Sequence, residues 1–375
     1  MEWWFHIPTA LWCAWVFVFG LGVGSFLNVL IARLPYEKSV VWPGSRCGAC
    51  FRPIWLLDNL PIIGYLRLHG RCRFCRTQFS SRYLWVELGT GLAFVGLFLV
   101  EVVAQAENGP DFLRPWQHAP GLRYSYTGSN ATAGPPIVAW VYFAAHACLL
   151  ALLIAAAVID AEHKIIPTQV TYPGALVGLV CAVVLPWPWP TAPSAAASIP
   201  PLGWLLDGGD QIPVGVVLWP FAGPPPEWAP PGSWQLGLMN GLVGAAVGTF
   251  LVRTFKFLFE WGFGQDALGL GDADLLMMVG AFLGWQVVFL GFFAGAFAAL
   301  GLMIPGLVWK LVRGKGAGSE LPFGPGLAVG VVFVWLGWPA LGAVRQILFD
   351  PILTGVVVAV MCVGLLAAGA LLRRG

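Results

Sequence analysis

Two aspartates stand at the edges of apolar segments, where a carboxylate is costly to place and usually has a task. Asp272 follows the turn Gly269-Leu270-Gly271 and precedes the apolar run 273–285. Asp160 closes another apolar run, 137–159, and opens a polar link. If both runs cross a membrane, the two carboxylates can meet at one face, share one proton and act as acid and base. The pair predicts a membrane-embedded aspartic protease.

The composition indicates a membrane protein. The 375 residues are 58% apolar and 10% charged, and the mean hydropathy of +0.78 exceeds that of soluble domains. A hydrocarbon core of about 30 Å needs roughly 20 apolar residues per helix. We expect an all-α, polytopic transmembrane helical bundle of 8–9 spans, near 10–31, 84–103, 137–159, 169–186, 236–256, 273–285, 286–309, 323–338 and 351–372. The short run 273–285 is expected to be a tilted or re-entrant half-helix.

The positions of lysine and arginine predict the orientation of this bundle. With the N-terminus outside, seventeen of the twenty Lys and Arg fall on the cytoplasmic side. Only Arg114, Arg123 and Arg345 then lie outside. Asp160 and Asp272 are both expected to face the cytoplasm.

Three domains are expected along the chain. They are a first transmembrane helix at 1–31, a cytoplasmic zinc-binding loop domain at 32–83, and a transmembrane protease core at 84–375. External insertions interrupt the core at 104–136 and 187–235, and the second is rich in proline, which favours extended or irregular chain.

Four cysteines in the loop have the spacing of a metal site. Cys47-Gly48-Ala49-Cys50 and Cys72-Arg73-Phe74-Cys75 are two Cys-x-x-Cys knuckles, separated by 21 residues. Each knuckle presents two sulfurs on one turn, as a tetrahedral zinc–thiolate site requires. Disulfides are the alternative, but a reducing cytoplasmic loop disfavours them. We attribute the basic residues of the loop to contact with anionic lipid headgroups or with bound thiolates, and not to nucleic acid.

A series of motifs extends along most of the chain in a defined order. It comprises Gly24-Ser25-Phe26-Leu27-Asn28-Val29, the two knuckles with Leu57-Asp58-Asn59-Leu60-Pro61 between them, Gly70-Arg71-Cys72-Arg73, Ser81-Arg82-Tyr83, Val86-Glu87, the Gly-x-Gly-Asp turn at 269–272 and Pro322-Phe323-Gly324-Pro325. In this order the motifs resemble those of the bacterial type IV prepilin peptidases. The resemblance implies a multi-pass protein of the bacterial inner (cytoplasmic) membrane whose catalytic residues are Asp160 and Asp272.

The resemblance also implies substrates and cofactors. Such enzymes remove the short basic cytoplasmic leader that precedes a hydrophobic helix in type IV prepilins or pseudopilins, which serve pili or protein secretion. Many relatives then methylate the new N-terminus with S-adenosylmethionine, and the zinc-bearing loop and the Asn28 region are similar to the form that does both. The expected partners are these precursors and membrane lipids, and the expected cofactors are structural zinc and S-adenosylmethionine.

Two residues depart from the family pattern. Thr168 stands where an acid usually follows Ile-Pro, which removes a negative charge near Asp160. Asp274 stands two residues after Asp272, where lysine is common. Helix positions two apart point about 200° away from each other, so Asp274 is expected outside the acid pair while placing a negative charge near it.

Other interpretations of the acid pair stay open. Asp272 could be only a helix cap, worth about 1 kcal/mol, and Asp160 only a solvated helix end. A cation or proton transporter would use Asp160, Asp272 and His146 along its path. A catalytically inactive relative would bind pilin precursors without cutting them, which the Thr168 and Asp274 departures make credible.

Several polar or small residues within the apolar runs need partners. Asn28 needs either a neighbouring helix or a ligand, and Glu87 either pairs with a loop arginine or helps to shape the active site. His146 lies about 21 Å along its helix from the aspartate that ends it, so a hydrogen bond to another helix is expected. Gly20 and Gly24 form a small-xxx-small pair, which predicts close helix packing.

Overall fold

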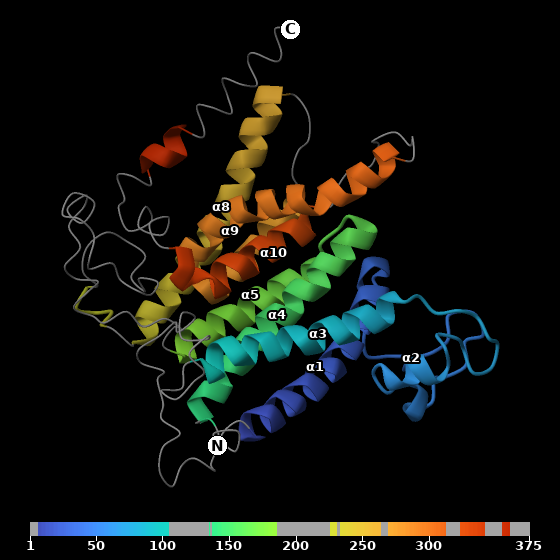
Figure 1. Ribbon diagram of the computed structural model, residues 1–375. Helices are drawn as coiled ribbons and strands as arrows, with labels where there is room; N and C mark the ends of the chain where they lie inside the picture. Colours follow the sequence, from blue (N-terminus) through green and yellow to red (C-terminus); the bar gives the residue numbers. More distant parts are fainter. Residues whose placement is uncertain are drawn as a thin grey trace. The chain divides into compact units, whose positions relative to one another are not determined.

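The computed structural model describes residues 7–104, 135, 137–185, 226–230, 233–263, 269–312, 323–341 and 355–360. Over these residues the regular structure is helical, with short 3-10 and π segments and two isolated β-bridges (Figure 1). The expected all-α class is therefore confirmed. The described residues form two compact units, of which the first contains 7–104 and 137–159 and the second contains those from Asp160 onward. The expected three-domain division stays a prediction.

Five helices in the described ranges are long and apolar enough to cross a membrane. They are Thr9–Tyr36, Arg82–Val103, Ala139–His163, Trp234–Gly262 and Leu270–Leu302. Two shorter apolar helices, Thr168–Val184 and Gly324–Leu336, match the expected spans 169–186 and 323–338. Of the expected span 351–372 only 355–360 is described, and the insertions 104–136 and 187–235 lie almost wholly outside the described residues. The total of 8–9 spans stays a prediction.

In the first unit, α1 (Ile7–Arg33) packs against α3 (Arg82–Phe98) through small residues. A Cβ added to Gly24 would lie 2.7 Å from the Cα of Glu87, and one added to Gly20 would lie 2.9 Å from the Cα of Gly91. Larger residues at these positions would push the two backbones apart. The predicted close packing at Gly20 and Gly24 is confirmed.

The loop domain between α1 and α3 is built from two similar knuckles and three helical turns. The turns are η2 (Leu34–Tyr36), η3 (Leu56–Asp58) and α2 (Ile63–Arg67). In each knuckle the N–H of the first cysteine donates to the carbonyl five residues later, from Cys47 to Arg52 over 3.0 Å and from Cys72 to Thr77 over 2.9 Å. The same backbone turn thus presents the sulfurs of both knuckles.

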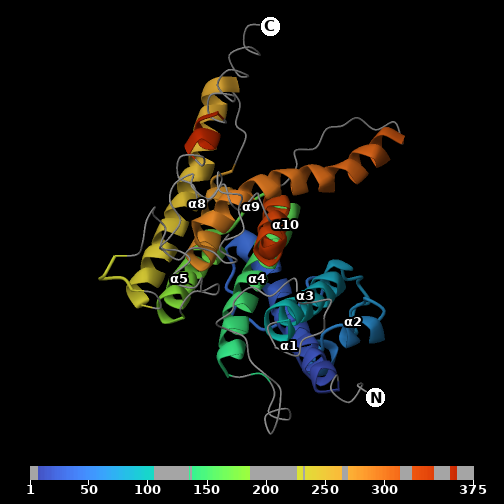
Figure 2. The ribbon, with the colours of Figure 1, turned by 60° about the vertical axis from the view of Figure 1, so that its left-hand side comes forward.

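The second unit is a group of tightly packed helices. It contains α5 (Thr168–Val184), α8 (Trp234–Phe263), α9 (Leu270–Val312), α10 (Gly324–Leu336) and η8 (Trp338–Leu341), with α5, α8 and α10 all packed on α9 (Figures 1 and 2). A Cβ added to Gly280 of α9 would lie 2.1 Å from the carbonyl oxygen of Gly244 of α8. These glycines let the two helices meet backbone to backbone.

One residue interrupts the 43-residue helix α9. Gly284 has φ 77° and ψ 173°, which glycine adopts at little cost and other residues do not. The two parts of α9 run in different directions on either side of it (Figure 2). Asn240 of α8 fills the break, because its side-chain nitrogen and oxygen lie 2.9 Å from where a Cβ of Gly284 would be. The expected boundary between the runs 273–285 and 286–309 therefore falls at Gly284.

Candidate functional site

Asp160 lies in the last turn of α4 (Ile137–His163) and is held by the start of α10. The N–H of Gly324 donates to Asp160 Oδ2 over 2.9 Å, and Asp160 is only 7% exposed. The first N–H groups of a helix have no partner within it and favour a negative charge. Asp160 is therefore buried against a helix N-terminus, and its interpretation as a solvated helix end is wrong.

Gly324 is a component of the site to which the sequence alone assigns no role. A Cβ on Gly324 would lie 2.6 Å from Asp160 Oδ2 and 3.0 Å from Asp160 Cγ. The backbone can therefore approach the carboxylate only because this residue has no side chain. The available signal was the sequence Phe-Gly-Pro-Gly at the start of an apolar run, where a helix begins and free N–H groups are exposed.

Asp272 lies in the first turn of α9. Its Oδ2 accepts the N–H of Gly269 over 3.1 Å, while its own N–H donates to the carbonyl oxygen of Gly269 over 3.2 Å. Asp272 is thus the third residue of the helix and not its N-cap, and its side chain reaches back to satisfy the free N–H of Gly269, as the acid of a capping box does. Asp272 is also buried, at 6% exposure. A cap alone needs no burial, so capping leaves room for a second role.

The second unit brings the two aspartates together from positions more than a hundred residues apart. Asp160 lies within electrostatic range of Asp272, so their charges repel each other. The chain after Asp160 also packs on the turn before Asp272, because a Cβ added to Gly271 would lie 2.9 Å from the Cβ of Ile166. Two buried carboxylates that repel each other resist being ionised at the same time.

The two departures from the family pattern lie near the acid pair. Asp274 is buried in α9 and is attracted by Arg253 of α8, a positive residue that partly compensates its charge. Thr168 is exposed at the first position of α5.

His146 has the interhelical partner that was expected for it. Its Nδ1 lies 2.5 Å from Oε1 of Glu101, and both side chains are buried in the first unit. Glu101 belongs to the π segment η4 (Leu99–Val103), and π segments often accommodate a functional or strained residue. The sequence offered no pattern for this pair, since two isolated polar residues in apolar runs do not specify each other.

The four cysteines of the knuckles converge on one point. Their sulfurs all lie within 4.8 Å of one another, with 3.7 Å between Cys47 and Cys75 and 3.9 Å between Cys50 and Cys72. Sulfurs at about 2.3 Å around a tetrahedral zinc ion would be about 3.8 Å apart, so the donor set fits such an ion. A disulfide needs about 2.05 Å, so neither of these contacts is a disulfide.

Hydrogen bonds in the second knuckle favour the thiolate form that binds metals. The Thr77 hydroxyl, 3.3 Å from the sulfur, and the Thr77 N–H lower the pKa of Cys75 to about 6. The N–H groups of Cys75 and Phe74 lower the pKa of Cys72. Because a metal ligand must be deprotonated, these donors prepare the knuckle for an ion.

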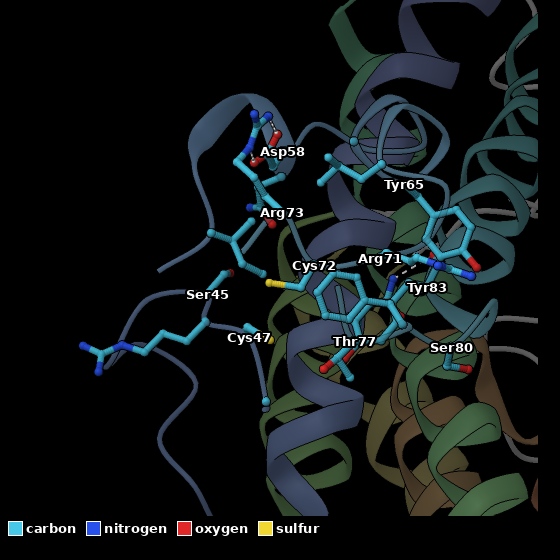
Figure 3. A pocket seen from close by; sticks show the side chains of 18 of the residues that line it. Ser45, Cys47, Asp58, Tyr65, Arg71, Cys72, Arg73, Thr77, Ser80 and Tyr83 are labelled. Carbon is cyan, nitrogen blue, oxygen red and sulfur yellow. Dashed lines mark hydrogen bonds and ion pairs between the residues drawn. The ribbon is translucent and has the colours of Figure 1, made fainter. Parts of the chain in front are cut away.

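A cavity of about 500 Å³ opens in the first unit between α1, α3 and the loop domain (Figure 3). Asn28 lines it at 3% exposure, and its Nδ2 donates to the carbonyl of Tyr83 over 3.0 Å. Its Oδ1 has no hydrogen-bond partner in the described part of the chain. Glu87 also lines the cavity, and its Oε2 accepts the N–H of Ile62 over 2.7 Å. Glu87 also has a side-chain hydrogen bond with Ser25, whereas the buried amide oxygen of Asn28 has no partner in this part of the structure.

Asp58 ties the two halves of the loop domain together at one side of this cavity. Arg73 donates from Nε to Asp58 Oδ2 over 2.6 Å and from Nη2 to Oδ1 over 2.5 Å, and Arg67 also pairs with Asp58 (Figure 3). Arg73 and then Arg67 hold the pKa of Asp58 down, at about 2. The carboxylate thus links α2 to the second knuckle.

Replacing Asp58 by asparagine should destabilise the loop domain by about 1 kcal/mol, because the arginines are partly exposed and solvent weakens the pairs. A lowered pKa in the folded state means that the stabilisation is present at neutral pH and is lost as the pH falls from 3.8 towards about 2. The difference in melting temperature between wild type and variant should therefore be constant near neutral pH and shrink in acid. Glu37→Gln, at an exposed acid of the same loop, is the matched control and should show no such difference. Both are measured on chelated protein, so that metal release does not mask the effect.

Two family models match parts of the chain that contain residues of the candidate sites. The model described as "Bacterial Peptidase A24 N-terminal domain" matches residues 18–100, which include the four cysteines. The model described as "Type IV leader peptidase family" matches residues 147–207, which include Asp160. Asp272 lies beyond both matches.

Curated relatives match over most of the chain. A prepilin leader peptidase/N-methyltransferase of Myxococcus xanthus is 30% identical over 81% of this chain and 65% of its own length. A protein of the same name from Aeromonas hydrophila is 27% identical over 88% of this chain and 90% of its own length. Another, from Klebsiella pneumoniae, is 28% identical over 74% of this chain and 88% of its own length. The chain thus spans less than two thirds of the Myxococcus protein but most of the other two. No solved structure matches the chain.

Proposed function

We propose, because the chain belongs to the type IV leader peptidase family, that it is a membrane-embedded aspartic endopeptidase that removes the leader of type IV prepilins or pseudopilins. The observation that carries the proposal is the pair Asp160 and Asp272. Both are buried in one unit, and each accepts a hydrogen bond from a glycine N–H, at Gly324 and Gly269. A backbone N–H holds a carboxylate in position without bringing a positive charge next to it. The carboxylate therefore stays able to exchange a proton, as acid–base catalysis requires.

The pair would hydrolyse a peptide bond without a covalent intermediate. Because two neighbouring carboxylates resist double ionisation, they hold one proton between them. The ionised member takes a proton from water, whose oxygen attacks the scissile carbonyl carbon, and the protonated member donates to the carbonyl oxygen. On breakdown, the first carboxyl gives its proton to the leaving nitrogen and the second recovers one from the new hydroxyl group, which restores the pair.

The proposed site faces the cytoplasm from a multi-pass protein of the bacterial inner membrane. The distribution of Lys and Arg supports this orientation, and both aspartates lie at helix ends instead of mid-helix. A basic leader would lie on the same side, since positive segments remain in the cytoplasm. A site at the membrane surface could then cut between leader and helix while the helix stays in the bilayer.

Incubation of the purified full chain in lipid nanodiscs with a prepilin-like peptide tests the activity. Mass spectrometry should show loss of the leader at one bond. A transporter would instead dissipate a proton or cation gradient in proteoliposomes without cutting the peptide, and an inactive relative would bind the peptide and release it intact. Either of these results would overturn the proposal.

We also propose that the tetracysteine cluster of the loop domain binds a structural zinc ion. Cys47, Cys50, Cys72 and Cys75 supply four sulfurs at tetrahedral spacing, and a closed Cys₄ set is typical of structural and not catalytic zinc. The ion would tie the two knuckles together and fix one wall of the cavity, to which Cys47 and Cys72 belong.

Replacing Cys47 by serine should abolish stoichiometric zinc binding, because an incomplete thiolate set holds the ion far more weakly. Elemental analysis of purified protein should give about one zinc ion per wild-type chain and much less in the variant. Cys13→Ser, in α1 and outside the cluster, is the matched control and should keep the zinc. Equal metal content in wild type and Cys47→Ser would reject the zinc site.

A second activity, N-methylation of the cleaved pilin with S-adenosylmethionine, is favoured by the cavity of the first unit and by the names of the relatives. The cavity has a suitable size for a small molecule, and the open Oδ1 of Asn28 offers it a buried acceptor. Labelled S-adenosylmethionine should transfer its methyl group to the cleaved peptide. Asn28→Leu should reduce this incorporation while leader removal continues. Absence of label in the product of the wild-type protein would reject the second activity.

A further inference from the structure

We propose that the loop domain carries a membrane-binding surface, formed by Leu56, Leu57, Ile63 and Leu66. We call these four residues the outer apolar surface. In this proposal they insert at the boundary between headgroups and acyl chains of the bilayer that α1 and α3 cross.

The outer apolar surface is exposed and is separate from the cavity. Leu56 is 83% exposed, Leu57 57%, Ile63 60% and Leu66 58%, and none of the four lines the cavity. Tyr65, from the same turn of helix, does line it. The segment is therefore two-sided, with one side facing the cavity and the other presenting large aliphatic side chains. Such a concentration of exposed apolar side chains on a domain indicates a binding surface.

The attachment of the loop domain keeps this surface next to a membrane. The domain follows directly on α1, which ends at Arg33, and runs directly into α3, which begins at Arg82. Both helices are long and apolar enough to span a bilayer. A domain tied at both ends to the same side of two spans cannot move away from the lipid headgroups. Apolar side chains held there are stabilised when they insert to a depth of about 5–10 Å, at the boundary between headgroups and acyl chains.

The charge of the domain selects a membrane over another protein. Residues 34–81 contain seven basic residues, namely Lys38, Arg46, Arg52, Arg67, Arg71, Arg73 and Arg76, and two acids, Glu37 and Asp58. A zinc ion held by the four cysteine thiolates would add two negative charges, so residues 34–81 keep an excess of three positive charges. Anionic lipid headgroups complement this excess. A second copy of the domain would bring the same excess and be repelled.

Aromatic rings and guanidinium groups close to this surface have the pairing expected at a lipid interface. Arg73 lies 5.6 Å from the ring centre of Trp55, and Arg52 lies 4.9 Å from that of Phe74. Trp55 and Phe74 are themselves exposed. Tryptophan is enriched at membrane interfaces. Arginine can lie there with its aliphatic stem on apolar surface and its charged guanidinium group among the headgroups.

Photo-crosslinking of the full chain in nanodiscs tests the proposal. Benzoyl-phenylalanine is introduced at Leu56 in one variant and at Leu66 in another, both exposed positions that are absent from the core. The matched control carries it at Gly44, an exposed residue of the same loop that lies outside the knuckles and the cavity lining and where an added Cβ meets nothing within 4 Å. The nanodiscs contain phosphatidylethanolamine with phosphatidylglycerol, or phosphatidylcholine alone, and mass spectrometry detects the adducts.

The expected result is several-fold more lipid adduct at positions 56 and 66 than at position 44, and less adduct at positions 56 and 66 when the anionic lipid is left out. Three results would overturn the proposal. Adducts with a second copy of the chain would make the surface a protein interface, and equal lipid adducts at all three positions would remove its specificity. Adducts with neither lipid nor protein would show that the surface faces water. A thermal-unfolding measurement on each variant confirms that it is folded, and Ile63 provides a further labelling position.

Discussion

We expect Asp160→Asn and Asp272→Asn each to abolish the proposed removal of the leader from a prepilin-like peptide. Asparagine has the size of aspartate, and its amide oxygen can still accept the N–H of Gly324 or Gly269, so the geometry of the site is kept. What disappears is the group that exchanges a proton with water or with the scissile carbonyl. Loss of one acid–base group reduces a rate by about 10²- to 10⁴-fold, and here neither remaining carboxyl can perform both tasks. Mass spectrometry of the peptide over time measures the effect.

The matched control for this pair is Asp274→Asn. Asp274 is a buried acid of the same helix, two residues from Asp272, and it lies near Arg253. Its replacement should leave most of the activity, because helix positions two apart point about 200° away from each other, which would direct Asp274 away from the acid pair. Activity in the double variant Asp160→Asn/Asp272→Asn would falsify the assignment of the pair. Loss of activity in Asp274→Asn alone would instead give this residue a part in the site.

Gly324→Ala should reduce leader removal by about 10²-fold, which corresponds to about 2.7 kcal/mol in the activation barrier. The new methyl group would lie 2.6 Å from Oδ2 of Asp160, closer than any normal contact. Either the carboxylate moves or α10 retreats, and both changes break the hydrogen bond from the N–H of Gly324. A displacement of about 1 Å of a catalytic group is enough for an effect of this size. Turnover of saturating peptide is the appropriate measurement.

Gly301→Ala separates this effect from a general intolerance of alanine in apolar helices. Gly301 lies in α9, and a Cβ added there meets nothing within 4 Å. Alanine is a better helix former than glycine, so this variant should be as stable as wild type or slightly more stable. If Gly324→Ala were as active as Gly301→Ala, the contact between α10 and Asp160 would have no catalytic importance. A melting temperature unchanged in Gly324→Ala would show that lost activity does not arise from unfolding.

Local spacing explains why much of the site could be predicted from the sequence. The two Cys-x-x-Cys knuckles each specify a turn that holds two sulfurs, and their convergence follows once a single ion must be bound. Asp160 and Asp272 could be singled out because a charge at the end of an apolar run is costly. The first five expected helices were also readable, since helix length and apolar content are set by a local stretch of chain.

The contacts that hold these groups depend on tertiary packing and could not be predicted. Every residue except proline has an N–H, so nothing in the sequence selects that of Gly324 as the donor to Asp160. The same is true of Glu87, one of whose partners is the N–H of Ile62. Glu101 and His146 lie on different helices, and which of many apolar faces meet is decided by side-chain shape. The sequence therefore predicts which polar groups are unfavourable to bury, whereas the fold determines which partners they bind.

The interruption of α9 at Gly284 has a consequence for the lipid around the acid pair. The part of α9 that begins at Leu270 and ends before Gly284 is only about 20 Å long, and α10, which supplies the N–H to Asp160, has a similar length. A hydrocarbon core is about 30 Å thick, so this part of α9 ends inside the core unless the bilayer is thinner around it. In either case the path from bulk water to Asp272 would be shorter than along a full span, and hydrolysis consumes one water molecule for each bond that is cut.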